Sequence, residues 1–393
     1  MAVAERRARL GLRHRLATEA RTDAPVEVAR SLVALHGTDP SSVYVGAWAR
    51  MHEGGVADIE RALYEDRSLI RLLGMRRTVF VTSLDVAPVL QAACSRAVAA
   101  RERRRLLDLL AASGVADDAA GVRGWLARAE DAALRALKAR GETTAAELAG
   151  DDPLLGTEVV LARGKSYEGR QKVASRLLLL LAAEGQVVRG RPRGSWTSHQ
   201  YRWAPLTDWS PGGLADWDTQ EAETDLAGRW LRAFGPATAE DLRWWAGWTK
   251  TQTKRALTPL RPVEVDLDGN TGIVLPDDLE PPSPTGDWAA LLPGLDSTPM
   301  GWQDRGWFLG EHGPRLFDRY GNIGPSLWWN GRIVGGWAQD SEGEIVCRFL
   351  EDIGAAGRTA VHAEADRLAA RLDGVRLTAR TRGRAWLEEE LAR

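Results

Sequence analysis

The stretch GETTAAEL at residues 141–148 is repeated in type and spacing as GPATAEDL at residues 235–242. In each copy, a glycine is followed three residues later by a threonine and six residues later by a carboxylate. A threonine three residues before a carboxylate is typical of a capping box or a close relative of it at a helix N-terminus. The repeat therefore predicts two short capped helices, one after Thr144 and one after Thr238.

Each repeat is followed by a second stretch of helical pattern that carries basic side chains. A short helix, a turn and a basic second helix are the order of elements in a helix-turn-helix unit. The predicted second helices and their basic residues are 170–184 with Lys172 and Arg176, and 249–257 with Lys250 and Lys254.

A predicted β-hairpin follows each of these units, as in a winged helix. In the first hairpin, over residues 186–203, Arg189, Arg191 and Arg193 alternate, and period-2 geometry would turn them to one face. We expect this basic wing to contact DNA phosphates. The alternative is a solvated edge kept positive against aggregation. The second hairpin, over residues 263–275, has an acidic tip, which makes a phosphate contact unlikely there.

A weaker unit of the same kind opens the chain, with predicted helices near residues 26–35 and 59–63 and a strand at 78–82. An apolar stripe at helical spacing predicts bridging helices before the first repeat. After an acidic, proline-rich linker at 277–286, short apolar runs around Asn330-Gly331 predict hairpins in a β-rich domain. The predicted domains are residues 1–95 (first winged unit), 96–140 (bridging helices), 141–210 (second winged unit), 218–276 (third winged unit) and 286–393 (β-rich domain).

Composition narrows the class of protein. The chain of 393 residues is 44% hydrophobic and 27% charged, and the longest apolar run, residues 177–183, is too short to span a membrane. The N-terminus lacks a secretory hydrophobic region, so we predict a cytoplasmic protein. Two cysteines cannot build a disulfide framework or a cysteine-rich zinc site, and the six histidines show no paired metal spacing.

The charge pattern is more informative than the net charge of −2. Arginines cluster in several short segments and acidic residues in others, which can create a basic face of the kind that nucleic-acid binders carry. The alternative is that these runs are ordinary solvated helix surfaces. No Walker loop, dinucleotide fingerprint, nucleophile elbow or metalloprotease helix occurs in the sequence.

A polar cluster, LHGTDP at residues 35–40, interrupts an apolar helical run. Thr38 or Asp39 can cap the next helix, with Pro40 at its first position. Capping does not exclude a second, chemical role for the same residues.

This cluster is one of several motifs by which the chain resembles the bacterial winged-helix DNA glycosylases, the group that includes azinomycin-resistance and crosslink-unhooking enzymes. The resemblance covers nearly the whole chain. It implies three tandem winged-helix units with a C-terminal β-barrel, hence a mainly helical fold with some β-structure. The motifs are LHGTDP (35–40) with Trp48-Ala-Arg50, MRRTVF (75–80), WWAGWTK (244–250), and LLPGLD (291–296) with NGRIVGGW (330–337).

The resemblance also implies an activity. Members are monofunctional glycosylases that excise alkylated purines without a metal or cofactor, so we expect a monomer acting on duplex DNA with an N7-adducted or crosslinked purine. The residues expected to contact DNA are Arg76, Arg77, Lys172, Arg176, Arg189, Arg191, Arg193, Lys250 and Lys254.

The family's catalytic motif is a glutamine, a small or apolar residue, then a glutamine or aspartate, and this sequence has His36, Gly37 and Thr38 in those positions. His36, with an ordinary pKa near 6.5, would accept a proton from water, Thr38 would orient that water, and Asp39 would supply negative charge. Alternatively, His36 stacks on a flipped purine. A further alternative is a catalytically inactive DNA-binding protein, a regulator or damage binder, on the same scaffold.

Overall fold

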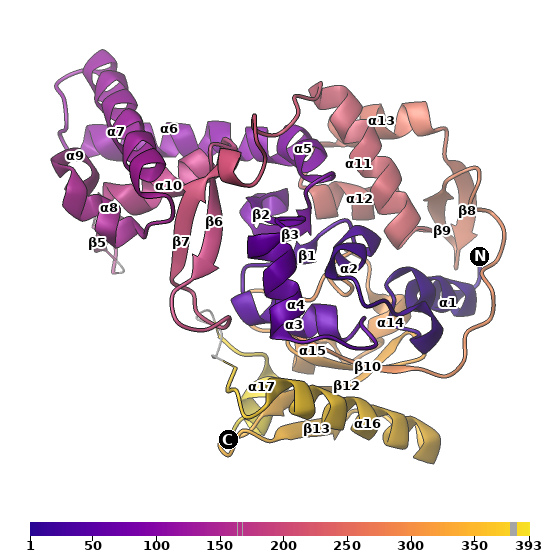
Figure 1. Cartoon of the computed structure of the whole chain (residues 1–393). Helices are drawn as coiled ribbons and strands as arrows, with labels where there is room; N and C mark the ends of the chain where they lie inside the picture. Colours follow the sequence, from indigo (N-terminus) through magenta and orange to yellow (C-terminus); the bar gives the residue numbers. More distant parts are fainter. Residues whose placement is uncertain (163, 167, 378–382) are drawn as a thin grey trace.

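The N-terminal segment folds around a small antiparallel sheet (Figure 1). In the computed structural model, which describes residues 1–162, 164–166, 168–377 and 383–393, the strand order is β1-β3-β2. Every residue of these strands is buried, so the sheet lies inside the core. The elements are α1 (Val3–Arg13), α2 (Pro25–Ser31), β1 (Leu35–His36), α3 (Pro40–Trp48), α4 (Val56–Glu60), β2 (Leu69–Leu73) and β3 (Val79–Ser83).

The predicted helix over residues 26–35 ends early, at Ser31. Val33 has a positive φ of 64°, a conformation that a β-branched residue adopts rarely and that a helix does not contain. The chain turns there and enters β1, where Leu35 pairs with Val81 and His36 pairs with Phe80. The prediction that His36 follows a helix is therefore wrong, because His36 lies on a strand.

The bridging helices and the second unit form a lobe that projects from the rest of the chain (Figure 1). The predicted apolar stripe of α7 is buried against α6 and α10. The helix predicted over 170–184 begins only at Val173, because residues 169–172 pair with residues 158–161 as a hairpin. The elements are α5 (Ala87–Leu90), α6 (Arg96–Ala112), α7 (Ala119–Arg140), α8 (Ala145–Asp151), α9 (Pro153–Gly156), β4 (Glu158–Leu161), β5 (Gly169–Lys172), α10 (Val173–Ala183), β6 (Val187–Pro192) and β7 (Tyr201–Pro205).

Both repeated motifs cap helices as the sequence predicts. Thr144 Oγ1 accepts from the Glu147 N–H at 3.2 Å, and the Glu147 carboxylate accepts from the Thr144 N–H at 2.7 Å. Thr238 and Asp241 form the same reciprocal pair, with both bonds at 3.0 Å. The third segment then has its helices and hairpin in the expected order: α11 (Thr219–Phe234), α12 (Ala239–Ala246), α13 (Lys250–Leu257), β8 (Val263–Leu267) and β9 (Asn270–Val274).

The C-terminal strands form an open sheet of order β10-β11-β12-β13, so the prediction of a barrel-like domain is wrong for the described residues. Four short strands are too few to close around a filled interior. Helices cover the sheet instead: α16 packs on β10, β11 and β13, while α14 and α17 pack on β12. The elements are β10 (Ala289–Leu292), α14 (Gly306–Leu309), α15 (Gly313–Leu316), β11 (Ser326–Trp329), β12 (Arg332–Gln339), β13 (Ile345–Phe349), α16 (Gly354–Leu372) and α17 (Trp386–Leu391).

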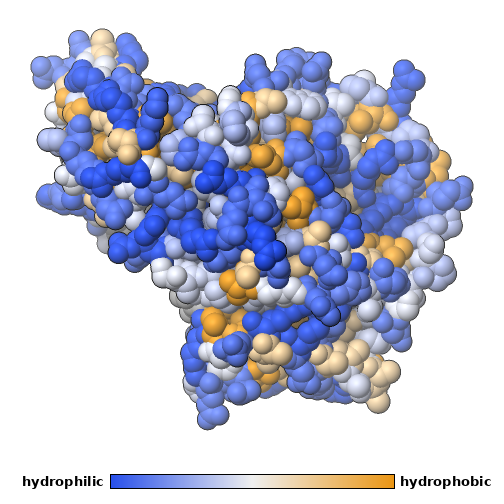
Figure 2. All heavy atoms as spheres, viewed as in Figure 1, coloured by the Kyte–Doolittle hydropathy of each residue, from blue (hydrophilic) through white to orange (hydrophobic). Residues whose placement is uncertain are grey.

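Two large groups of buried side chains make up most of the core. One joins the N-terminal segment, the α11–α13 segment and the C-terminal sheet, and the other belongs to the projecting lobe. On the face shown in Figure 2, hydrophobic residues are scattered among hydrophilic ones. The division into five domains remains a prediction.

A buried ion pair joins the N-terminal segment to the C-terminal segment. The Arg50 guanidinium donates to both carboxylate oxygens of Asp296, at 2.9 and 2.7 Å, and to Thr298 Oγ1 at 2.8 Å. The His14 ring lies 2.8 Å from the same Thr298 oxygen. Burial, reinforced by Arg50, lowers the pKa of His14 to about 3, so this imidazole is neutral.

Candidate active site

His36 is held from the C-terminal side of the molecule. Its backbone N–H donates to Ser297 Oγ at 2.9 Å, and the Ser297 hydroxyl donates to the Ala34 carbonyl at 2.8 Å. The imidazole packs edge-on against Phe80, with ring centroids 5.3 Å apart, and His36 is only 5% exposed. Strand pairing and the Ser297 hydroxyl thus hold the backbone of His36, and Phe80 packs against its ring.

The imidazole of His36 has one nitrogen near Thr38 and one nitrogen free. Nε2 lies 3.5 Å from Thr38 Oγ1, and Nδ1 is buried without a partner among the described residues. Burial, together with the charge of Arg76, lowers the pKa of His36 to about 3. The expectation of an ordinary pKa is therefore wrong. At neutral pH the ring is uncharged and able to accept a hydrogen bond from water.

Thr38 and Asp39 differ sharply in their surroundings. Thr38 is exposed, whereas Asp39 is buried and caps α3, with Pro40 as its first residue. Asp39 Oδ1 accepts from the Ser41 N–H at 3.0 Å and from the Ser41 hydroxyl at 2.8 Å. The capping role is confirmed, and it occupies one of the two carboxylate oxygens.

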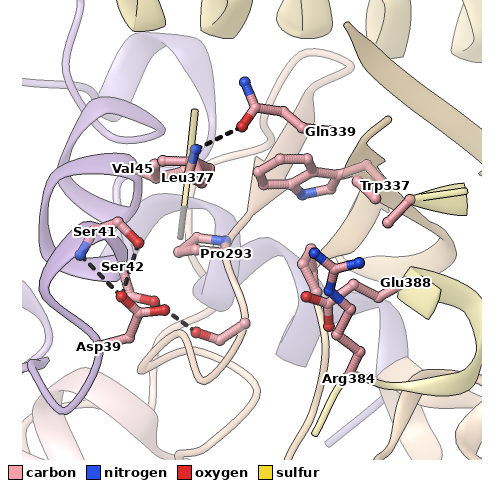
Figure 3. Close-up of a pocket in the computed structure, with 14 residues that line it drawn as sticks. Asp39, Ser41, Ser42, Val45, Pro293, Trp337, Gln339, Leu377, Arg384 and Glu388 are labelled. Atoms are coloured by element: carbon pink, nitrogen blue, oxygen red, sulfur yellow. Dashed lines mark hydrogen bonds between the residues drawn. The ribbon is translucent and has the colours of Figure 1, made fainter. Parts of the chain in front are cut away.

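Asp39 also lines a small pocket between α3 and the C-terminal sheet (Figure 3). Ser41 and Ser42 flank it there, and Trp337 and Gln339 form the opposite wall. Neither His36 nor Thr38 is among the lining residues. This pocket is therefore separate from the free nitrogen of His36.

The turn between β2 and β3 carries two of the residues expected to contact DNA. Arg76 and Arg77 have positive φ values of 51° and 65°. The Arg76 guanidinium lies 4.0 Å from the ring of Trp244, so the motifs at 75–80 and 244–250 meet in space. Arg77 is exposed and forms an ion pair with Glu102 at 2.7 Å.

In the predicted basic wing, β6–β7, Arg189 and Arg191 contact side chains of the protein itself. Arg189 stacks on Tyr201 and Trp203, each at 5.2 Å, and Arg191 forms ion pairs with Glu60 and Glu65. A bulge after Arg189 interrupts the strand register, while the burial pattern still alternates through Arg189 and Arg191. Arg193, beyond the bulge, is exposed.

Lys172, Arg176, Lys250 and Lys254 form no salt bridge with the residues that the structure describes. Lys172 precedes α10, and its neighbour Arg176 donates to Gln171 at 2.9 Å. Lys250 and Lys254 are exposed on α13. These side chains are available to an anionic partner.

Sequence reasoning assigned no role to Arg71, which is 3% exposed beneath the β6–β7 hairpin. It donates to the Tyr64 hydroxyl at 3.3 Å and stacks on Tyr201 at 5.1 Å. Its Nε and Nη1 have no partner among the described residues, and a Cβ built on Gly37 would lie 3.6 Å from Nη1. The sequence signal that could have identified Arg71 is a charged residue in the middle of the apolar run LIRLL, residues 69–73.

The tip of the same hairpin covers an aromatic pair on α3. The ring centroid of Trp196 lies 4.8 Å from that of Tyr44 and 5.4 Å from that of Trp48. The hairpin thus covers Arg71 and the side of α3 that carries Tyr44 and Trp48.

Comparison with known proteins shows the family. A model of the family described as "DNA glycosylase AlkZ-like" matches residues 29–371, which is most of the chain. The chain belongs to the AlkZ-like DNA glycosylase family. It is similar in structure to the Streptomyces sahachiroi DNA glycosylase AlkZ, with a TM-score of 0.70 and 19% sequence identity.

The AlkZ alignment covers 96% of this chain and 98% of that one, and at this identity it shows a common fold. A search of curated proteins found no match. Within the described residues, no helix is long and apolar enough to cross a membrane. The same residues contain no group of three or more His, Cys, Asp or Glu side chains arranged to hold a metal ion.

The two buried histidines of this AlkZ-like protein make its stability depend on pH. In the unfolded chain both bind protons with a pKa near 6.5, whereas the folded chain resists protonation until about pH 3. We expect the free energy of unfolding to fall as the pH drops below about 6.5, by up to ~1.4 kcal/mol per pH unit for each histidine.

Urea midpoints measured between about pH 7 and pH 4 check this expectation. His14→Gln and His36→Gln should each reduce the pH dependence. His199→Gln, at an exposed position, serves as the control and should leave it unchanged. Equal pH dependence in all variants would contradict the prediction.

Proposed function

We propose that this protein hydrolyses the N-glycosidic bond of an alkylated purine in duplex DNA, either an N7-adducted or a crosslinked base. The observation that carries the proposal is the neutral imidazole of His36, whose Nε2 lies 3.5 Å from the exposed Thr38 hydroxyl. By the resemblance of the sequence, His36 and Thr38 correspond to positions of the family's catalytic motif, and the family model matches residues 29–371, a range that includes both.

The chemistry asks little of the protein, because an N7-alkylated purine is a cation and leaves as a neutral base. The base departs with the electron pair of the bond to C1′, and an oxocarbenium-like sugar forms. Water then bonds to C1′ through its oxygen, and the resulting oxonium, a strong acid, releases its proton to solvent. A neutral His36 accepts a hydrogen bond from this water, Thr38 orients it, and the second oxygen of Asp39 adds negative charge near the developing cation.

DNA binding in this proposal involves three tandem winged helix-turn-helix units. The exposed side chains of Lys172, Arg193, Lys250 and Lys254 support it, since they are available to phosphate oxygens. The outline in Figure 2 is indented between the projecting lobe and the C-terminal helices, and β6–β7 lies beside that indentation. We propose a cytoplasmic monomer that requires no metal or cofactor.

Base release from defined duplexes tests the proposed function. A labelled duplex with a single N7-methylguanine, and a second with a nitrogen-mustard crosslink, are incubated with the protein and then with hot alkali. We expect strand cleavage at the lesion, and much less with the His36→Ala/Thr38→Ala double variant. Cleavage no greater than that of the double variant on both duplexes would contradict the proposal.

One observation favours a second candidate, a DNA-binding protein without catalytic activity. His36 is almost fully buried, and its lowered pKa makes it a weak base. This candidate predicts tight, salt-dependent DNA binding with no base release from either duplex.

A further inference from the structure

Two arginines from distant parts of the chain meet at Trp244. The guanidinium carbon of Arg76 lies 4.0 Å from the centre of the tryptophan ring, and that of Arg305 lies 4.9 Å from it. Arg76 comes from the β2–β3 turn, Trp244 from α12, and Arg305 from the loop before α14. All three side chains are half-buried.

Neither arginine forms a salt bridge with any residue that the structure describes. Nε of Arg76 is buried and has no hydrogen-bond partner in the described chain. Arg305 donates from Nε to the Pro299 carbonyl at 3.0 Å, and its Nη2 lies 3.9 Å from the sulfur of Met300. The two guanidinium groups thus keep N–H groups that donate to no carboxylate of the described chain.

The nearby carboxylate of Asp241 raises the pKa of Arg305 but forms no ion pair with either arginine, because both of its oxygens accept hydrogen bonds elsewhere. Oδ1 accepts from the backbone N–H groups of Gln303 and Asp304, at 2.9 and 3.0 Å. Oδ2 accepts from the N–H and the hydroxyl of Thr238, at 3.0 and 2.8 Å. Asp241 therefore serves the α12 cap and the loop that presents Arg305.

Two of the other arginines stacked on rings have carboxylate partners, and the rest, such as Arg71 and Arg189, form no salt bridge with the described residues. Arg191 lies over Tyr64 and binds Glu60, and Arg358 lies over Phe349 and binds Asp352. At Trp244, burial and the charge of Arg76 lower the pKa of Arg305 to about 10. Arg76 also has a positive φ of 51°, a backbone conformation that residues other than glycine adopt rarely.

We propose that Arg76 and Arg305, held against Trp244, bind a phosphodiester of the DNA strand that carries the target base. The forked donors of arginine match phosphate oxygens, and an anion there balances two charges that form no salt bridge with the described residues. The site deepens the proposed function and rests on it, because Arg76 is close enough to His36 to lower its pKa. A phosphate at this place screens the positive sugar from both arginines.

Salt-dependent binding to an undamaged duplex tests the phosphodiester site without any need for catalysis. Affinity is measured by fluorescence anisotropy over a range of salt concentrations for the wild type, Arg76→Met, Arg305→Met and Arg305→Lys. Methionine preserves apolar contact with Trp244 and removes the charge. The matched control is Arg358→Met. Arg358 lies 4.9 Å from the centre of the Phe349 ring, the same distance as Arg305 from Trp244, but it already forms a salt bridge with Asp352.

We expect each methionine variant at Trp244 to reduce the slope of log affinity against log salt by about 0.9 per lost phosphate contact. Arg305→Lys should keep most of the slope, and Arg358→Met should keep all of it. Melting temperatures of all variants show whether each one is folded. If a methionine variant folds poorly, Arg305→Lys still shows whether binding depends on the positive charge at this position.

An unchanged slope in Arg76→Met and Arg305→Met would overturn the phosphodiester site, as would an equal reduction in Arg358→Met. Wild-type protein that binds DNA with the expected slopes but releases no base leaves the site supported and contradicts only the proposed function. Wild-type protein that shows no salt-dependent binding overturns both.

Discussion

Replacing His36 with alanine is expected to slow base release by roughly 10²- to 10⁴-fold, because the substitution removes the neutral imidazole beside Thr38 to which the proposal assigns a hydrogen bond from water. DNA affinity should stay the same, since the imidazole carries no charge at neutral pH. Single-turnover rates on an N7-methylguanine duplex measure the first effect, and anisotropy measures the second.

His36→Gln is the decisive companion variant, since it restores the residue type of the resembled motif. It should retain or raise the rate, while His199→Ala, at an exposed position, should change nothing. Because burial lowers the pKa of His36 to about 3, the wild-type rate should also stay level as the pH falls to about 5. Unchanged excision by both His36→Ala and His36→Gln would remove this residue from catalysis.

Replacing Arg50 with methionine is expected to lower the free energy of unfolding by about 3–5 kcal/mol. The substitution leaves the Asp296 carboxylate buried without its cation, since both residues are at most 3% exposed. Urea denaturation followed by tryptophan fluorescence gives the shift in midpoint.

The double variant Arg50→Met/Asp296→Leu should be more stable than Arg50→Met alone, because it removes both buried charges together. The control is Arg358→Met, whose partner Asp352 is largely exposed, and here the loss should be at most about 1 kcal/mol. A loss for Arg50→Met no larger than that for Arg358→Met would contradict the importance of the buried pair.

Local signals in the sequence predicted local structure well. The capping boxes after Thr144 and Thr238 and the hairpin at Asn330-Gly331 depend on neighbouring residues, and each is confirmed. Strand β1 was not predictable, because its two residues gain their strand character from pairing with Val81 and Phe80, more than 40 positions away. The resemblance implied a barrel, whereas the strand pattern predicted only a β-rich domain, since strand patterns do not tell whether the edges of a sheet meet.

Charge was the least reliable guide to the site. The sequence predicts that Arg191 contacts DNA from the wing, but in the structure it pairs with Glu60, which lies 131 positions earlier. The burial that lowers the pKa of His36 likewise comes from segments far apart in the sequence. Arg305 lies outside every motif that carried the resemblance, so only its position over Trp244 draws attention to it.

The resemblance motifs also turned out to hold scaffold residues as well as site residues. Arg50 and Asp296, which end two of them, form the buried ion pair, and the Trp337 indole donates to the Leu292 carbonyl at 2.9 Å. A motif is thus evidence for the fold first, and a role in chemistry must be argued from geometry.

The hydrogen bond between His36 and Ser297 affects how the chain folds during its synthesis. Arg50 leaves the ribosome 246 residues before Asp296, its partner, and at 5–20 residues per second this takes roughly 12 to 50 s. Throughout that interval, Arg50 lacks its carboxylate and the His36 strand lacks the Ser297 hydroxyl that holds it. The nascent N-terminal segment is therefore an incomplete core, and the loop that bears His36 and Thr38 acquires its final form only after about three quarters of the chain have emerged.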